Sequence, residues 1–102
     1  MKRFGLEEKD IENIVGVFKQ FTEIEKAVIF GSRARGDFRD NSDIDIALYG
    51  EKITNDIHTQ IFYKLEELYL IYKIDLINFY KLGQNNSIKN NIINEGVEIY
   101  AK

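Results

Sequence analysis

Two acidic residues, Asp43 and Asp45, open an apolar run near the middle of the chain, and their spacing points to metal chemistry. Alternate side chains of a β-strand point to the same face, so the two carboxylates would lie roughly 7 Å apart along one face. Ile44, Ile46 and Leu48 would then point the other way, toward a core. Two like charges side by side raise each other's pKa unless a cation lies between them. Mg²⁺ prefers hard oxygen ligands and usually binds through one or two carboxylates plus substrate phosphates.

A Gly–Ser pair, Gly31 and Ser32, follows the preceding apolar run Ala27 to Phe30. Glycine lets a backbone approach a phosphate closely, and serine is a favoured N-cap residue of a helix. If Ser32 begins a helical turn, the free N–H groups of that turn form an anion site. A phosphate-binding turn beside metal-binding carboxylates predicts nucleotide chemistry.

These residues form a motif, Gly31-Ser32-Arg33-Ala34-Arg35-Gly36 followed by Ser42-Asp43-Ile44-Asp45. The motif resembles that of the DNA polymerase β-type nucleotidyltransferase superfamily. It is most similar to the smallest branch, the minimal nucleotidyltransferases (MNT), which are typically antitoxins encoded beside a HEPN-domain toxin. The two common competing nucleotide motifs, G-x-x-x-x-G-K-[ST] and G-x-G-x-x-G, are absent from the sequence.

The apolar periodicity predicts eight elements, and we expect them to form a single domain over residues 1–102. In chain order they are a helix at 6–21, a strand at 26–30, a helical turn at 33–36, a strand at 43–49, a helix at 54–70, a strand at 73–80, a helix at 88–94 and a short strand or extended tail at 97–100. This order predicts an α/β or α+β fold, a small mixed sheet packed with helices. The resemblance implies the same nucleotidyltransferase fold.

Candidate capping residues stand at the start of the long helix predicted at 54–70 and of the short helix predicted at 88–94. Thr54, Asn55 or Asp56 would cap the helix at 54–70, and Ser87 would cap the helix at 88–94.

A third carboxylate, Asp75, lies inside the apolar strand predicted at 73–80, between Ile74 and Leu76. A carboxylate in such a strand is costly without a partner. One interpretation is a satisfied carboxylate at the edge of the sheet. In the superfamily a third acidic residue on a neighbouring strand completes a triad, and the resemblance implies that Asp75 is this residue.

The resemblance implies that Asp43, Asp45 and Asp75 are the catalytic and metal-binding residues. They would hold Mg²⁺, as two ions about 3.5–4 Å apart, with ATP as the substrate. Asp75 would ligate the second ion or act as a base on the attacking hydroxyl. Ser32 and the backbone of Gly31 would hold the terminal phosphates.

Arg33 and Arg35 are the candidate cationic contacts to the nucleotide, because guanidinium groups suit phosphate. Each could instead pair with an acidic residue of the loop that follows, Asp37 or Asp40.

The function implied by the resemblance is that of an antitoxin with Mg-dependent protein adenylyltransferase activity. It would transfer AMP from ATP to a hydroxyl, tyrosine in the family's pattern, of a cognate HEPN ribonuclease toxin and so neutralise it. The core fold takes up nearly all of the 102 residues, so another chain must bring the acceptor. One alternative is a non-catalytic antitoxin that acts by complex formation. Another is the catalytic subunit of a two-chain small-molecule nucleotidyltransferase.

The composition excludes or disfavours several other kinds of protein. The formal net charge of −3 argues against direct DNA or RNA binding, which needs clustered Lys and Arg. The absence of cysteine excludes disulfides and thiolate metal sites. There is no apolar run of transmembrane length and no signal-peptide segment in MKRFGLEEKD, so we expect no membrane association and a cytoplasmic protein.

Overall fold

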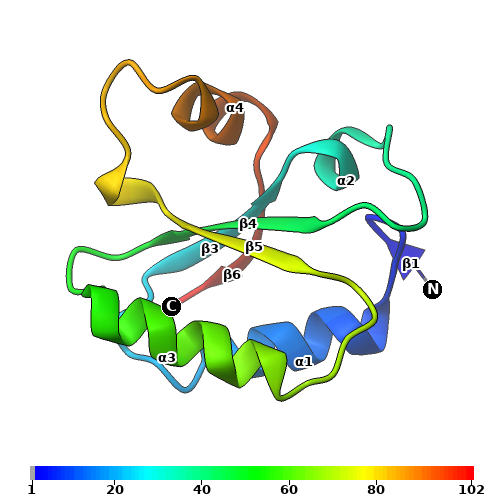
Figure 1. Ribbon diagram of the computed structural model, residues 1–102, viewed down its shortest axis with the longest axis horizontal. Helices are drawn as coiled ribbons and strands as arrows, with labels where there is room; N and C mark the ends of the chain where they lie inside the picture. The colour runs from blue at the N-terminus through cyan, green and yellow to red at the C-terminus, as the bar shows by residue number, and fades with distance from the viewer. Residues whose placement is uncertain (1) are drawn as a thin grey trace.

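A four-stranded mixed sheet lies at the centre of the molecule, with helices on both of its faces (Figure 1). The computed structural model describes residues 2–102. Its elements are β1 (Lys2–Arg3), β2 (Leu6–Glu7), α1 (Glu8–Phe18), β3 (Lys26–Phe30), α2 (Ser32–Arg35), β4 (Ile44–Tyr49), α3 (Asn55–Glu66), β5 (Ile74–Asn78), the 3-10 turn η1 (Phe79–Lys81), α4 (Ser87–Glu95) and β6 (Val97–Ala101).

The strands of this sheet are ordered β5-β4-β3-β6. β3 runs antiparallel to both β4 and β6, whereas β4 and β5 are parallel. A parallel pair needs a crossover connection, and α3 supplies it between β4 and β5. The predicted small mixed sheet packed with helices is confirmed, and the segment at 97–101 is a paired strand rather than a tail.

The main core lies between the sheet and the layer formed by α1 and α3 (Figure 1). Ile44, Ile46 and Leu48 of β4 are fully buried there, as the alternation of β4 predicts. Phe18 at the end of α1 and Ile61 of α3 are also fully buried against them. Burial of these side chains removes apolar surface from water, which is the main force that holds the sheet to this layer.

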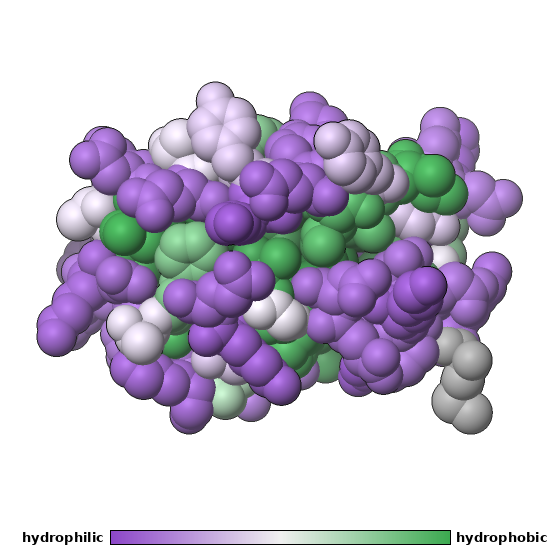
Figure 2. All heavy atoms as spheres, turned by 90° about the horizontal axis from the view of Figure 1, so that it is seen from below, coloured by the Kyte–Doolittle hydropathy of each residue, from purple (hydrophilic) through white to green (hydrophobic). Residues whose placement is uncertain are grey.

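The opposite face of the sheet is covered only in part, by α2 and α4 (Figure 1). A smaller apolar cluster there comprises Val28, Phe30, Ala47, Phe79 and Ile92. Figure 2 shows the outer face of the α1 and α3 layer, where hydrophilic side chains surround a narrow band of apolar ones. The two faces of the sheet therefore differ, and the α2 and α4 side leaves strand residues accessible.

The first helix is shorter than predicted. It begins at Glu8, because Leu6–Glu7 pairs with Lys2–Arg3 as a hairpin. The turn of this hairpin contains two residues with positive φ, Phe4 at 59° and Gly5 at 73°, which a helix does not allow. Leu6, which falls inside the helix predicted at 6–21, is 1% exposed and packs into the core from the hairpin.

The ends of α3 and α4 also differ from prediction. α3 stops at Glu66 rather than near residue 70, because the chain tightens into i→i+3 hydrogen bonds and Tyr69 adopts a φ of 52°. Thr54 caps α3 as expected, accepting a hydrogen bond from the Ile57 N–H at 3.2 Å. The cap of α4 is Asn86 rather than Ser87, since the Asn86 side-chain oxygen accepts from the N–H of Ile88 at 2.8 Å.

Across residues 2–102, none of the helices combines the length and the apolar character needed to cross a membrane.

The substitution Ile46→Ala tests the main core. Ile46 is fully buried at the centre of β4, so its truncation removes transfer free energy and leaves a cavity. We expect a loss of about 3 kcal/mol in the free energy of unfolding, measured by urea denaturation. The control Ile93→Ala, at a side chain that is 61% exposed, should change this free energy by less than about 0.5 kcal/mol. Equal losses in the two variants would contradict the assignment of the core.

Candidate active site

Strand pairing brings the three predicted carboxylates to one end of the sheet. Asp45 of β4 is the register partner of Asp75 of β5, and Asp43 lies immediately before β4. Alternation directs Asp45 away from the buried Ile44 and Ile46, toward the face that carries α2 and α4. Asp43 and Asp75 are exposed, and Asp45 is half-buried. Because adjacent strands lie about 4.8 Å apart, the carboxylates of Asp45 and Asp75 share one small region.

The Gly–Ser pair lies beside these carboxylates. β3 ends at Phe30, the register partner of Asp45, and Gly31 follows with a φ of 77°. A methyl group at Gly31 would collide with Oδ2 of Asp45, so only glycine leaves room for the carboxylate against the backbone. α2 then runs from Ser32 to Arg35 and is followed by its C-cap residue Gly36, which adopts the left-handed conformation with a φ of 95°.

Asp45 is the carboxylate whose pKa is shifted by its surroundings. Burial raises the pKa of its carboxyl above the ordinary value, and the nearby charges of Asp75 and Asp43 raise it further. The positive charge of Arg35 acts in the opposite direction. Three carboxylates that repel one another are a donor set that suits a hard divalent cation.

The donor chemistry therefore fits Mg²⁺, although the three side chains do not already surround one point. Within the described part of the chain, residues 2–102, no group of three or more His, Cys, Asp or Glu side chains is arranged to hold a metal ion. The carboxylates would have to draw together around a cation as it binds.

Arg33 lies beneath the loop rather than at the carboxylates. Its side chain is 2% exposed, and the guanidinium donates to the carbonyl oxygens of Ser42 at 2.9 and 3.1 Å, Phe4 at 3.0 Å and Asp40 at 3.3 Å. The rings of Phe38 and Tyr72 lie 5.1 and 4.5 Å from its Cζ. A phosphate in the open site would have to displace these contacts. We therefore leave Arg33 out of the proposed phosphate contacts.

Arg35 pairs with an acidic residue of the loop that follows α2, which is the alternative to a phosphate contact. Its guanidinium forms ion pairs with Asp37 at 3.2 Å and with Glu95 at 3.0 Å. Hydrogen bonds to these two carboxylates raise its pKa. Glu95, at the end of α4, was not anticipated from the sequence, since 60 residues separate it from Arg35 and no local pattern connects them. Arg35 is close enough to Asp45 to act on its charge, and it already has two carboxylate partners.

The family model that describes the polymerase beta nucleotidyltransferase domain matches residues 12–102. The chain therefore belongs to this nucleotidyltransferase family, as the motif predicted. A protein of Methanocaldococcus jannaschii named "Putative protein adenylyltransferase MJ0604" is 45% identical over 47 residues, covering 44% of this chain and 47% of the relative. The chain thus matches about half the length of that curated relative.

Solved structures support the same fold. A chain of a toxin–antitoxin complex crystallised with AMP-PNP superposes with a TM-score of 0.72 at 20% identity, covering 95% of this chain and 75% of the other. A chain from the complex of tri-AMPylated HEPN toxin with MNT antitoxin, from Shewanella oneidensis, gives a TM-score of 0.70 at 15% identity, covering 95% and 74%. At these identities the likeness shows the fold.

The contact between Gly31 and Asp45 can be tested with Gly31→Ala. The added Cβ meets Oδ2 of Asp45 and the backbone is strained at a φ of 77°, so the free energy of unfolding should fall by about 1–3 kcal/mol. The matched control is Gly83→Ala, where a Cβ has nothing within 4 Å, and it should be neutral. Urea denaturation of the two variants makes the comparison, and a neutral Gly31→Ala would refute the close packing.

The raised pKa of Asp45 has a consequence for stability in metal-free buffer. The folded state keeps the Asp45 proton over a pH range in which the unfolded state has released it, so the stability of the native sequence should fall as pH rises through that range. Asp45→Asn removes this repulsion and should be more stable at pH 7. The gain should vanish below the unfolded pKa, about 3.9.

Thermal unfolding of Asp45→Asn with a chelator present, from pH 3.5 to 7, measures this effect. Asp40→Asn removes the same charge from an exposed loop position and serves as the control. A gain for Asp45→Asn that stays constant across this pH range would show that the carboxylate is not destabilised by burial and its acidic neighbours.

Proposed function

We propose that this chain is a Mg²⁺-dependent nucleotidyltransferase that transfers AMP from ATP to a hydroxyl of a partner protein. The observation that carries the proposal is the placement of Asp43, Asp45 and Asp75 at one end of the sheet, with Asp45 against Gly31, inside the region that the family model matches. The strand register assembles this group from two segments about 30 positions apart in the sequence. A purely structural role would not require three repelling carboxylates at one end of a sheet.

Each element of the site has a role in this reaction. Asp43, Asp45 and Asp75 would hold Mg²⁺, which when bound neutralises charge on the phosphate oxygens. Ser32 and the backbone at Gly31 would hold the terminal phosphates. The exposed Asp75 would also accept the proton of the acceptor hydroxyl. The acceptor oxygen then bonds to the α-phosphorus, and the bond from that phosphorus to the leaving pyrophosphate breaks.

We further propose that the partner is a HEPN-domain toxin encoded nearby, and that AMP transfer to one of its hydroxyls, a tyrosine in our proposal, neutralises it. Two findings support this assignment. The fold matches chains of toxin–antitoxin complexes, one with AMP-PNP and one with a tri-AMPylated toxin. Part of the chain also matches the relative named "Putative protein adenylyltransferase MJ0604".

One observation favours a second candidate, an antitoxin that acts by complex formation without catalysis. The carboxylates of residues 2–102 form no ready-made metal site. In that case the charged end of the sheet would be a relic of a catalytic ancestor.

Intact-mass spectrometry separates the two candidates. The purified chain is incubated with its co-encoded neighbour and Mg-ATP, and the masses of both proteins are taken before and after. We expect the neighbour to gain one or more AMP units. The double variant Asp43→Asn/Asp45→Asn should abolish the gain, and omission of Mg²⁺ should do the same.

The matched control is Asp37→Asn/Asp40→Asn, which removes two charges from the adjacent exposed loop. This control should keep most of the transfer. No added mass, together with a stable complex and a silenced neighbour, would refute the enzyme and support the non-catalytic antitoxin. An added mass that persists in the Asp43→Asn/Asp45→Asn variant would place the catalytic site elsewhere.

A further inference from the structure

Lys73 stands beside the carboxylates, although it lies outside the motif that first indicated the site. It immediately precedes Ile74, whose register partner is Ile44, so it occupies the position next to Asp43 on the neighbouring strand. The N–H of Ile44 donates to the carbonyl oxygen of Lys73 at 2.8 Å, which fixes this pairing. Alternation along the strand places Lys73 on the same face as Asp75.

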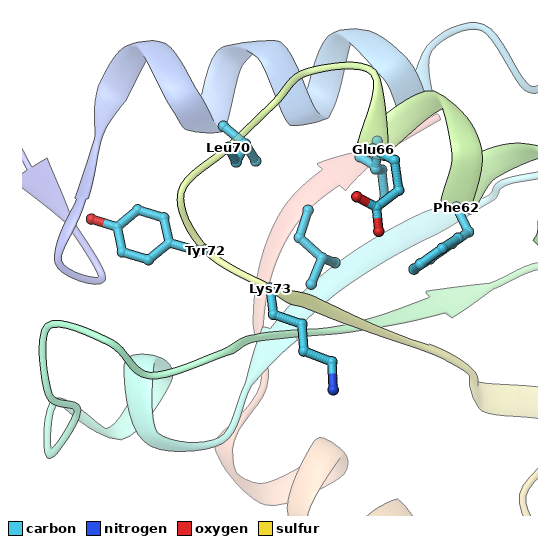
Figure 3. A pocket seen from close by; sticks show the side chains of 7 residues that line it. Phe62, Glu66, Leu70, Tyr72 and Lys73 are labelled. Atoms are coloured by element: carbon cyan, nitrogen blue, oxygen red, sulfur yellow. The ribbon is translucent and has the colours of Figure 1, made fainter.

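Figure 3 shows the direction of this side chain. Lys73 lies at the rim of a small pocket lined mainly by apolar residues, among them Phe62, Leu70 and Tyr72. Its ammonium group extends away from them, toward the side of the sheet that carries α2 and α4. The charge of Lys73 therefore faces the carboxylate side of the sheet, although the Lys73 backbone lies in the segment that connects α3 to β5.

Across the described residues, several of the cations around the site are already engaged by other groups, whereas Lys73 is not. Arg33 is held by three carbonyl oxygens, and Arg35 by two carboxylates. Further along the same face, Lys26 lies over the ring of Tyr49 at 4.4 Å. Within residues 2–102 the exposed side chain of Lys73 makes no hydrogen bond or ion pair. Its charge is available to a ligand.

The order of the strands indicates which part of a nucleotide Lys73 would meet. Gly31 and Ser32 follow β3, the carboxylates belong to β4 and β5, and Lys73 precedes β5. A triphosphate whose terminal phosphate lies at Ser32 must extend across β4 toward β5. The α-phosphate, which is farthest from the terminal end, then lies nearest to Lys73.

We propose that Lys73 contacts the non-bridging oxygens of the α-phosphate of the bound nucleoside triphosphate. The inference rests on the proposed function, since that function places the terminal phosphates at Ser32. An ammonium group on a flexible four-carbon chain is a suitable point charge for a phosphate oxygen. At this position it would both hold the nucleotide and stabilise the negative charge that develops during transfer. The signal in the sequence is a lysine two residues before the third aspartate, so that both side chains share a face.

Calorimetric titration with three nucleotides tests the contact. AMP, ADP and α,β-methylene-ATP are titrated in the presence of Mg²⁺ into the native sequence, Lys73→Ala and Lys73→Arg, without an acceptor. We expect Lys73→Ala to weaken the binding of all three by a similar factor, about ten- to a hundredfold, because all three contain the α-phosphate. Lys73→Arg should recover most of the affinity. Lys9→Ala removes the same charge from an exposed position on α1 and should leave binding unchanged.

The other possible results distinguish a wrong role for Lys73 from a wrong function of the chain. A loss confined to α,β-methylene-ATP would move the contact to the terminal phosphates and refute the proposal. Native-like binding by a folded Lys73→Ala, with circular dichroism matching the native sequence, would also refute it and leave the proposed function intact. A native sequence that binds none of the three nucleotides would refute the proposed function itself, together with this inference.

Discussion

The buried guanidinium of Arg33 holds together the parts of the chain that surround the site. It joins α2 to the turn of the N-terminal hairpin at Phe4 and to the loop at Asp40 and Ser42. A buried charge costs several kcal/mol unless its surroundings compensate it. Here three carbonyl oxygens and two aromatic rings provide that compensation. Because Ser42 directly precedes Asp43, the same interaction fixes the point at which the first carboxylate enters the site.

This anchoring allows the site to contain charges that oppose one another. Asp45 lies against Gly31, and burial together with the charges of Asp75 and Asp43 raises its pKa, so its ionised form is destabilised in the absence of a cation. The main core, on the other face of β4, is apolar and fully packed around Ile46. The stability gained there offsets the repulsion at the end of the sheet. Such a separation between a stable core and a destabilised site is expected where a binding site is built on a rigid scaffold. The scaffold must hold the repelling charges together until a ligand binds and reduces their repulsion.

Three positively charged side chains around the site, Arg33, Arg35 and Lys73, have different roles. Arg33 organises the backbone, Arg35 connects α2 to the end of α4 through Glu95, and Lys73 remains available at the edge of the sheet. Of these, only Arg33 and Arg35 belong to the motif that identifies the family. A motif records residue types at fixed spacing, and it does not distinguish an arginine that supports a phosphate-binding turn from one that contacts the phosphate.

The sequence by itself determined the family and the mixed sheet, and it placed Asp45 and Asp75 on strands with Asp43 at the start of the first of them, because alternation and the Gly31–Ser32 spacing are local properties. It also placed strands β3 and β6 and the cap of α3 closely. Only the tertiary structure showed that Leu6 belongs to a hairpin. A buried leucine just before a helix gives the same apolar periodicity as a leucine within the helix. The tertiary structure also decided the separate roles of Arg33 and Arg35, and it brought Glu95 to Arg35. These outcomes depend on which partners surround a side chain after folding, and partners distant in sequence leave no local pattern.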